Sequence, residues 1–316
     1  MDVLHGWRDT PEALKGASLA IGNFDGVHRG HRAVLKAAQA AAAPGRKAGA
    51  IVFEPHPRKF FQPGKPLFQL TNLSRKLELI AECGMDLAVV LPFDAELASL
   101  SAESFVHDVL VEGLAISHTV TGYNFFFGKG RQGNTQLLKT LGTKYGFGVT
   151  IVEAAGSSGE IYSSTRVREL LAEGDVAGAA EILGAWWQVE GTVEAGAGRG
   201  RGLGFPTANI RLVEGQSLSH GIYAVRVLAK GGWRHGAAYL GTRPTFDSGP
   251  PLLEIFLFDF EGDLYGETVK VDFIEFIRPD AKFRSGGDLA LQMRVDCEKA
   301  KAVLETQAPL SGRSTA

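Results

Sequence analysis

The sequence predicts an α/β domain with a doubly wound parallel sheet, followed by an antiparallel β-barrel domain with a terminal helix. In the first half, short apolar segments alternate with amphipathic stretches of helical period, which is typical of parallel strands joined by helices. Near Gly184 the period changes from about 3.6 to 2, and glycine-rich turns separate the later runs. We therefore expect domains at residues 1–184 and 185–308, with a flexible tail at 309–316.

The strands of the first domain are expected where short apolar runs occur. These runs are residues 17–21, 50–53, 86–91, 118–121 and 149–152. Helices are expected where apolar residues recur every three or four positions, at residues 28–43, 74–82, 103–111, 135–144, 165–171 and 176–183. Ser74 is the expected N-cap of the second helix. Because the strands are parallel, a ligand should bind beyond their carboxyl ends.

The second domain is expected to consist of short alternating strands. Candidate strands are residues 187–193, 222–227, 252–258 and 269–276. A last helix at residues 288–304 should close the domain. Short strands separated by glycine-rich turns favour a small antiparallel barrel or sandwich over a second parallel sheet.

The amino-acid composition limits the kinds of partner that the protein can bind and the cellular compartment in which it is expected. The 33 Lys and Arg residues nearly balance the 35 Asp and Glu residues, so a nucleic-acid polymer is not the expected main partner. Cys83 and Cys297 are too few for a disulfide framework or a paired zinc motif, which favours a reducing compartment. We see no signal-peptide pattern and no apolar run of membrane-spanning length. We therefore expect a cytoplasmic protein without a membrane partner.

The segment IGNFDGVHRGH, residues 21–31, combines a strand end, a glycine-rich turn and a helix start. Glycines let the backbone turn sharply and approach a ligand closely. His28 and His31 are three positions apart and so share one face at the helix N-terminus, where anions bind favourably. Two imidazoles there can stabilise charge in phosphoryl chemistry. The alternative is a tight turn with two incidental histidines.

A second phosphate-binding group is expected at the helix that begins near Ser164. The Ser164 and Thr165 hydroxyls lie where backbone amides are free, and Arg168 lies on the same helix face as Ser164. Together they can bind phosphate groups. A plain N-cap is the alternative role of Ser164.

The motif at residues 21–31 resembles the HxGH signature of the nucleotidyltransferase superfamily. The surrounding residues resemble its flavin adenylyltransferase branch, the N-terminal module of bacterial bifunctional riboflavin kinase/FAD synthetases. Four more segments resemble that module: FEPHP (53–57), LTNLSRKLELIAECGMD (70–86), GYNFFFGKGRQGN (122–134) and IYSSTRVREL (161–170).

This resemblance implies roles for particular residues in the transfer of AMP from ATP to FMN. His28 and His31 would be catalytic, and the remaining nucleotide-binding residues would be Gly22, Phe24, Asp25, Gly26, Gly30, Ser164, Thr165 and Arg168. The flavin would contact His56, Pro57, Asn124 and Phe127. His56 has a purely structural loop role as its alternative. One of the rings of residues 125–127 would stack on the isoalloxazine, although phenylalanines in such a run are more often core residues.

The glycine-rich stretch in the second half has neither a GxGxxG nor a Walker A motif, so a barrel hairpin is its generic interpretation. However, RGRGLGFPTANI (199–210) resembles the RGRxLGFPTAN signature of riboflavin kinase. Four later segments fit the same family: HGIYAVRV (220–227), GTRPTF (241–246), LLEIFLFDFEGDLYG (252–266) and VDFIEFIRPDAKF (271–283).

The riboflavin kinase resemblance implies a second set of roles. Thr207 and Asn209 would hold Mg²⁺ and the ATP phosphates, since both offer oxygen ligands to a hard cation. Glu254 would be the general base that deprotonates the ribityl 5′-hydroxyl. Gly204 would contact ATP and Arg243 the flavin. The structural alternatives are a turn residue at 207 and an outward strand position at 254.

Three departures from the riboflavin kinase pattern bear on the kinase step. Phe256 stands where the family often has a histidine, and Tyr239 stands where it usually has an asparagine. The proline that commonly precedes the GIYAV strand is absent from SLSHG (217–221). None of these positions carries a proposed catalytic role, but they can alter flavin affinity or weaken the kinase.

The expected function is therefore a bifunctional enzyme that phosphorylates riboflavin to FMN and adenylylates FMN to FAD. Its substrates would be riboflavin, FMN and ATP, with Mg²⁺ as cofactor. The first alternative is a monofunctional FAD synthetase whose barrel binds flavin but is impaired as a kinase. The others are a flavin carrier without activity and an adenylyltransferase for another acceptor. The sequence leaves homo-oligomerisation open.

Overall fold

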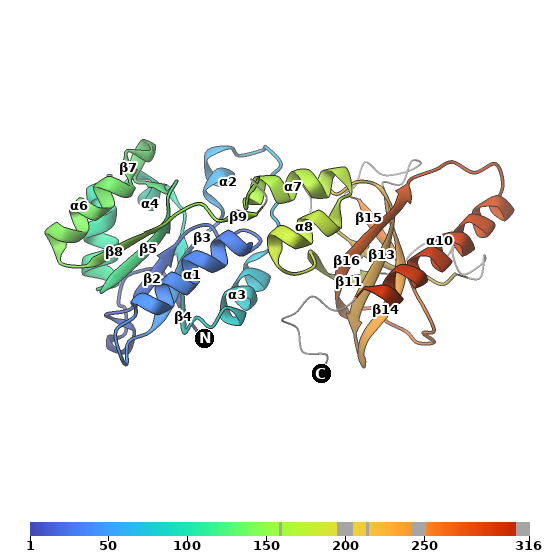
Figure 1. The fold of residues 1–316 in the computed structure, drawn as a ribbon, viewed down its shortest axis with the longest axis horizontal. Helices are drawn as coiled ribbons and strands as arrows, with labels where there is room; N and C mark the ends of the chain where they lie inside the picture. Colours follow the sequence, from blue (N-terminus) through green and yellow to red (C-terminus); the bar gives the residue numbers. More distant parts are fainter. Residues whose placement is uncertain (158–159, 195–204, 213–214, 242–250, 308–316) are drawn as a thin grey trace. The chain divides into compact units, whose positions relative to one another are not determined.

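The computed structural model describes residues 1–157, 160–194, 205–212, 215–241 and 251–307. It divides into two compact units, which are described separately and can be followed in Figure 1. Unit 1 comprises residues 1–67 and 71–163, and unit 2 comprises residues 68–70 and the chain from Ser164 onward. The predicted site residues Gly204 and Arg243 and the predicted tail lie outside the described residues.

Unit 1 contains a six-stranded sheet in the order β1-β4-β3-β2-β5-β8, with all its pairings parallel. Its strands are β1 (Asp2–His5), β2 (Ser18–Ile21), β3 (Ala48–Glu54), β4 (Leu87–Pro92), β5 (His118–Gly122) and β8 (Gly148–Val152). The central strands read as continuous apolar runs because both faces of the sheet are covered. The sequence analysis missed β1, an edge strand with no residue in the buried class.

The two faces of this sheet carry different apolar clusters. Ala50 and Val52 of β3 face a cluster that includes Leu35 of α1. Ile51 and Phe53 face the opposite cluster. This alternation makes the sheet doubly wound. The helical segments of unit 1 are η1 (Glu12–Leu14), α1 (Arg29–Ala41), α2 (Pro57–Phe61), α3 (Leu73–Glu82), α4 (Ala95–Ser99), α5 (Ala102–Ser104), the π-helical η2 (Phe105–Gly113), η3 (Lys129–Arg131) and α6 (Thr135–Tyr145).

The prediction that Ser74 caps the second helix is wrong. The helix α3 starts one residue earlier, at Leu73, and its N-cap is Asn72, whose side chain accepts a hydrogen bond from the Arg75 amide at 2.8 Å. Asparagine is at least as good an N-cap as serine, so the earlier start satisfies the first turn equally well. Unit 1 also contains two short hairpins, β6 (Phe126–Phe127) with β7 (Gly133–Asn134) and β9 (Gly156–Ser157) with β10 (Glu160–Ile161).

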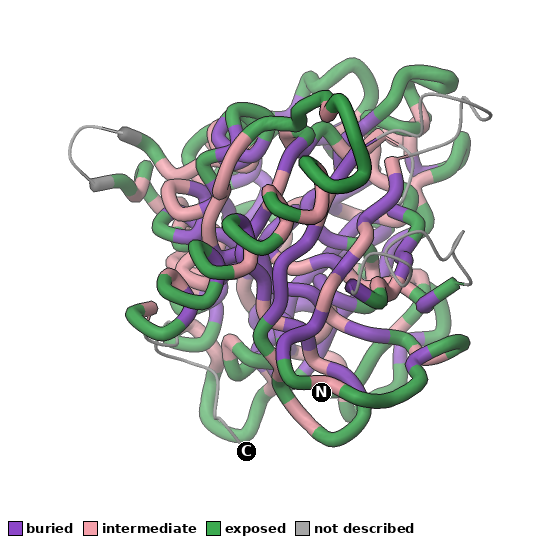
Figure 2. Tube along the Cα trace, turned by 90° about the vertical axis from the view of Figure 1, so that its right-hand side faces the viewer, coloured by how far each residue is buried: buried purple, intermediate pink, exposed green. Residues whose placement is uncertain are grey.

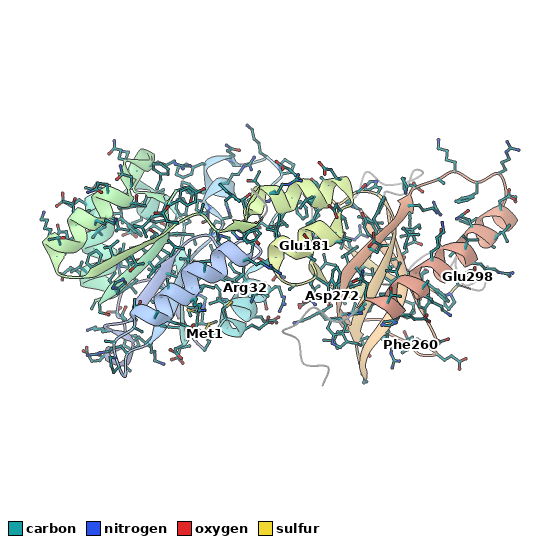
Figure 3. The ribbon with its side chains drawn as sticks, in the orientation of Figure 1. Met1, Arg32, Glu181, Phe260, Asp272 and Glu298 are labelled. Atoms are coloured by element: carbon teal, nitrogen blue, oxygen red, sulfur yellow. The ribbon has the colours of Figure 1, made fainter. Side chains whose placement is uncertain are left out.

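Unit 2 contains a closed barrel in the order β11-β12-β15-β14-β13-β16, with antiparallel pairings throughout. The strands are β11 (Gln188–Glu194), β12 (Ala208–Arg211), β13 (Gly221–Ala229), β14 (Gly232–Gly241), β15 (Leu252–Leu257) and β16 (Thr268–Pro279). The β11–β16 pairing is reinforced by Gln188, which donates a 2.7 Å hydrogen bond to the buried Asp272 carboxylate. Asp272 is labelled on the barrel in Figure 3. Most barrel strands contain several buried residues, and buried residues are coloured purple in Figure 2.

In the part of unit 2 that the structure describes, three helices accompany the barrel: α7 (Ser164–Glu173), α8 (Val176–Leu183) and α10 (Gly286–Thr306). The last helix is anchored to β16 by Arg278, which forms a 2.7 Å ion pair with the buried Asp296. The parallel α/β sheet, the antiparallel barrel and the terminal helix confirm the predicted fold class. The unit boundary before Ser164 groups α7 and α8 with the barrel, and the functional boundary at residue 184 stays a prediction.

Candidate functional site

Three predicted segments of unit 1 follow three neighbouring strands of its sheet. The turn that starts at Gly22 follows β2, the segment at His56 follows β3, and Asn124 follows β5. Because β3, β2 and β5 are adjacent and parallel, their carboxyl ends meet at one edge of the sheet. The structure therefore brings these residues to the edge at which α/β sheets bind ligands.

The turn between β2 and α1 has an unusual backbone. Phe24 and Val27 have positive φ angles of 46° and 43°, and Gly26 has φ 82°. Side chains disfavour this region, so the surrounding structure must hold the two non-glycine residues there. It does so by burial, since Phe24 is 1% exposed and Val27 is fully buried. The turn is thus rigidly shaped before any ligand binds.

The predicted nucleotide-binding residue Asp25 lies inside this turn. Its carboxylate accepts hydrogen bonds from the Thr71 amide at 3.1 Å and from the Thr71 hydroxyl at 3.3 Å. The same hydroxyl accepts a bond from the Gly26 amide at 3.1 Å. These contacts join the turn to the segment before α3. Asp25 therefore stabilises the turn, in addition to its predicted role in nucleotide binding.

The two motif histidines stack at the start of α1. His28 is the N-cap, and its Nδ1 accepts a 3.3 Å hydrogen bond from the His31 amide. The ring centroids are 3.6 Å apart with an interplanar angle of 21°. A Cβ at Gly30 would lie 3.0 Å from the His28 ring, which explains the glycine between them.

The His31 imidazole is kept neutral by its surroundings. Burial lowers its pKa well below the usual value, and the neighbouring His28 and Lys76 lower it further. Its Nδ1 is buried and has no hydrogen-bond partner among the described residues. His31 therefore presents a hydrogen-bonding group, rather than a positive charge, to anything bound at this turn.

The residues predicted to contact flavin occupy different environments. His56 is the N-cap of α2, with its Nδ1 accepting a 3.1 Å bond from the Arg58 amide, and Pro57 is the first helical residue. Asn124 is exposed after β5. Phe127 is 7% exposed and packs in the core against Phe105, with ring centroids 5.7 Å apart.

Phe126 is the most exposed of the three consecutive phenylalanines, at 48%. The Arg131 guanidinium lies over its ring at 4.8 Å. An exposed ring offers a free face for stacking, whereas a ring packed in the core does not. The fold therefore favours the middle ring of the run as a surface for aromatic contacts.

Ser164, Thr165 and Arg168 belong to unit 2, whereas the two histidines belong to unit 1. Ser164 and Thr165 form the first turn of α7, and Thr165 is exposed. The Arg168 Nε donates a 2.6 Å hydrogen bond to the Phe68 carbonyl within unit 2. This bond uses the Nε–H donor of the guanidinium, so Arg168 has a structural contact besides its predicted phosphate contact.

In the barrel, strand register places three residues of interest in one row. Asn209 of β12 is directly opposite Glu254 of β15, which is directly opposite Tyr239 of β14. Directly opposed residues in antiparallel strands point to the same face with neighbouring Cβ atoms. Thr207 precedes this row, and its carbonyl accepts a 3.3 Å hydrogen bond from the side-chain Nδ2 of Asn209. The structure thus brings together the predicted general base and a predicted metal ligand.

Tyr239, a departure from the riboflavin kinase pattern, is part of the electrostatic environment of Glu254. Burial and the nearby Asp280 raise its pKa to about 12, with a further contribution from the Glu254 charge. Its hydroxyl donates a 3.2 Å hydrogen bond to Asp280. Tyr239 is therefore a neutral neighbour of Glu254 whose hydroxyl is directed to another carboxylate.

Thr207 and Asn209 offer oxygen atoms of the kind that can hold Mg²⁺. Hydroxyl and amide oxygens fit a hard cation that keeps several waters and substrate phosphates in its coordination shell. Asn209 is 5% exposed, which holds its side chain in a defined position beside Glu254. The described residues contain no cluster of three or more His, Cys, Asp or Glu side chains of the kind that forms an all-protein metal site.

Comparison with known families defines the class of protein for each half of the chain. The family model for FAD synthetase matches residues 10–166, and the model for riboflavin kinase matches residues 183–304. The first match contains the histidine turn, and the second contains the Asn209–Glu254 row. An adenylyltransferase-type α/β module thus precedes a kinase-type barrel. The chain belongs to the bifunctional riboflavin kinase/FMN adenylyltransferase family, as its motifs predicted.

Curated relatives support this assignment over nearly the whole chain. The bifunctional riboflavin kinase/FMN adenylyltransferase of Escherichia coli (strain K12) is 39% identical over 298 residues, covering 93% of this chain and 94% of the relative. Its counterpart in Haemophilus influenzae is 37% identical, covering 96% of this chain and 99% of the relative. The counterpart in Listeria monocytogenes is 36% identical, covering 90% and 91%.

A similar solved structure carries a different description. A crystal structure of a Streptococcus pneumoniae protein described as a macrolide-efflux protein has a TM-score of 0.82 and 26% identity, covering 98% of this chain and 100% of that chain. In the part of this chain that the structure describes, no helix has the length and apolar character needed to cross a bilayer.

Sequence reasoning gave no role to Lys76, which lies on α3 and is fully buried. A detectable signal was present in the sequence. Lys76 is three residues before Leu79 and four before Ile80, and so shares the apolar face of the helix. A lysine in that position is uncommon unless its ammonium has a partner or a function.

Proposed function

We propose that this chain converts riboflavin to FAD in two ATP-dependent steps. The barrel phosphorylates riboflavin to FMN, and the N-terminal α/β module adenylylates FMN and releases pyrophosphate. The succession of a FAD synthetase match and a riboflavin kinase match in one chain carries this proposal. Both reactions use ATP, and the free thiols Cys83 and Cys297 accord with the cytoplasmic setting expected from the sequence.

In the kinase step, Glu254 would take the proton of the ribityl 5′-hydroxyl. The oxygen then attacks the γ-phosphorus of ATP, the bond to the β-phosphate oxygen breaks, and ADP leaves. Thr207 and Asn209 would hold Mg²⁺, which supplies charge neutralisation on the phosphates. The directly opposed positions of Asn209 and Glu254 support this division of roles, because the proposed metal ligand and the proposed base then share one face of the barrel wall.

In the adenylylation step, a phosphate oxygen of FMN would attack the α-phosphorus of ATP. The bond between the α-phosphorus and the bridging oxygen breaks, and pyrophosphate leaves. No covalent nucleophile is required. His28 and His31 would hydrogen-bond to the phosphates, with His31 neutral because of its burial. The rigid turn supports this role, since donors that are already positioned need no reorganisation during the reaction.

One observation favours the alternative of a monofunctional FAD synthetase with an impaired kinase barrel. Tyr239 occupies the position beside Glu254 where the family usually has an asparagine, and a bulky aromatic side chain there can obstruct the flavin or the base. In that case the barrel would bind flavin without phosphorylating it. The bifunctional proposal requires Glu254 to reach the ribityl hydroxyl despite this neighbour.

A time course with riboflavin, ATP and Mg²⁺ tests the proposal. Flavins separated by chromatography should show FMN rising first and FAD rising as FMN is consumed. Chelation of Mg²⁺ with EDTA should stop both products. FAD formed from supplied FMN, with no FMN formed from riboflavin, would support the monofunctional alternative. The absence of both FMN and FAD would contradict the proposed function.

A further inference from the structure

Lys76 is a fully buried lysine of unit 1. It projects from α3, has no exposed surface, and its Nζ lacks a hydrogen-bond partner among the described residues. A buried ammonium without compensating hydrogen bonds is costly, and such groups are retained mainly where they have a function. Apolar packing alone would be better served by leucine or methionine at this position.

The surroundings of Lys76 are those of the adenylylation turn. Burial lowers the Lys76 pKa, while the charges of Asp25 and Glu54 raise it. The Lys76 charge in turn contributes to the low pKa of His31. Lys76 is therefore within electrostatic range of one motif histidine and of a carboxylate in the turn that carries both histidines.

Three polar atoms of this neighbourhood are buried and unpartnered among the described residues. They are Lys76 Nζ, Glu54 Oε2 and His31 Nδ1. They come from three different elements: α3, the carboxyl end of β3 and the first turn of α1. Native proteins satisfy most buried polar atoms, so a group of three points to a bound polar ligand that completes their hydrogen bonds.

Because His31 is neutral, another group must supply positive charge to balance the ATP phosphates. ATP brings several negative charges to the adenylylation site, and hydrogen bonds from neutral imidazoles compensate them only in part. Lys76 carries a positive charge within range of His31, on a flexible stem of four carbons that can extend toward a phosphate. A bound phosphate would also accept hydrogen bonds from the Lys76 ammonium, which has no hydrogen-bond partner among the described residues.

We infer that Lys76 is a catalytic residue of the adenylyl transfer, whose ammonium contacts the ATP phosphates and neutralises the charge that develops as pyrophosphate leaves. This inference rests on the proposed function, since it assigns the cation of that same site. Glu54 and Asp25 hold the ammonium between turnovers, and the phosphates draw it away. Lys76 itself forms no covalent bond and transfers no proton.

The test uses the full chain carrying Lys76→Met, which keeps an unbranched apolar stem that is one atom shorter and removes the charge. We expect kcat for FAD formation from FMN to fall about 100-fold, with a smaller change in KM for FMN, because the lost contact strengthens in the transition state. FMN formation from riboflavin by the same preparation should be unchanged. The matched control is Lys139→Met on α6, an exposed lysine of unit 1, which should leave both activities unchanged.

A merely structural role for Lys76 predicts a different pattern. If the ammonium only compensates Glu54, then Lys76→Met with Glu54→Gln removes both charges and should restore FAD formation. Under our inference the double variant stays as slow as Lys76→Met. Near-ultraviolet circular dichroism and thermal unfolding establish that each variant is folded, and Lys76→Gln, which retains a donor, serves if Lys76→Met unfolds.

Two results would overturn the inference. One is a rate of FAD formation by folded Lys76→Met that lies within about threefold of the rate of the unchanged protein. A threefold change in rate corresponds to less than half of the activation free energy of a tenfold change. The other is recovery in the double variant. An unchanged chain that forms FMN but no FAD would overturn the proposed adenylylation, and this inference with it. A large loss confined to the Lys76 variants would support both.

Discussion

The two units carry their candidate residues in different parts of their architecture. In the parallel sheet of unit 1 they follow the strands, on turns and helix starts beyond the carboxyl ends of β2, β3 and β5. In the barrel, Asn209, Glu254 and Tyr239 lie on the strands themselves, aligned across three of them. A parallel sheet collects ligand-binding residues from successive loops, whereas an antiparallel barrel collects them through strand register.

This difference predicts different responses to mutation. A residue on a turn can be changed without disturbing the sheet, provided that the helix start keeps its cap. A residue on a barrel strand has neighbours on both adjacent strands, so its replacement must preserve size. The Glu254 and His28 substitutions follow these limits and compare the two activities of one chain.

The largest effect is expected for Glu254→Gln, which retains size and removes the base. FMN formation from riboflavin should fall about 1000-fold, because general-base catalysis contributes roughly 100- to 10,000-fold. FAD formation from supplied FMN should persist at the rate of the unchanged protein. Rates from initial-velocity assays of both steps check this. Undiminished kinase activity would remove Glu254 from the base role.

The reciprocal effect is expected for His28→Ala in unit 1. FAD formation should fall about 100-fold through loss of a phosphate contact, while FMN formation persists. Because His28 is also the N-cap of α1, His28→Asn is the matched control for helix stability. The asparagine variant should fold like the unchanged protein and still lose FAD formation. Equal loss of both activities in a folded variant would contradict the two-site division.

A smaller effect is expected in the pH dependence of unit 1 stability. Because the pKa of His31 is lowered below 6.5 in the folded state, the unfolded chain binds its proton more readily. The free energy of unfolding should therefore fall as pH drops below 6.5, by at most about 1.4 kcal/mol per pH unit from this residue. Hydrogen exchange of unit 1 amides between pH 7.5 and 5.5 measures the slope. His31→Gln should flatten it, and an unchanged slope would show that His31 is not responsible.

The smallest effect is expected for Tyr239→Phe, which removes the hydroxyl that bonds to Asp280. The free energy of unfolding should fall by about 1 kcal/mol, the typical net value of one hydrogen bond. FMN formation should change less than about tenfold, because the hydroxyl is directed away from the proposed base. Denaturant titration and kinase assays check both values. A strong gain of kinase activity in Tyr239→Asn would instead show that the aromatic ring obstructs the reaction.

Much of the fold followed from local patterns in the chain. The period of the apolar residues located most strands and helices within a few residues, and the change of period separated the parallel sheet from the barrel. The edge strand β1 was missed because it carries no buried run. The barrel strands β12 (Ala208–Arg211) and β14 (Gly232–Gly241) were also not among the predicted strands, and β12 is short and depends on β11 and β15 for its pairing.

Some features of the candidate site were likewise predictable from local sequence, and others depend on the folded structure. Residues 21–31 predicted the histidine turn because glycines, a strand end and a helix start are all local features. The alignment of Asn209, Glu254 and Tyr239 was decided by the folded structure, because register depends on which strands pair and not on the residues of any one strand. The burial of Lys76 and the neutrality of His31 were decided there too, since desolvation depends on everything that packs around a group.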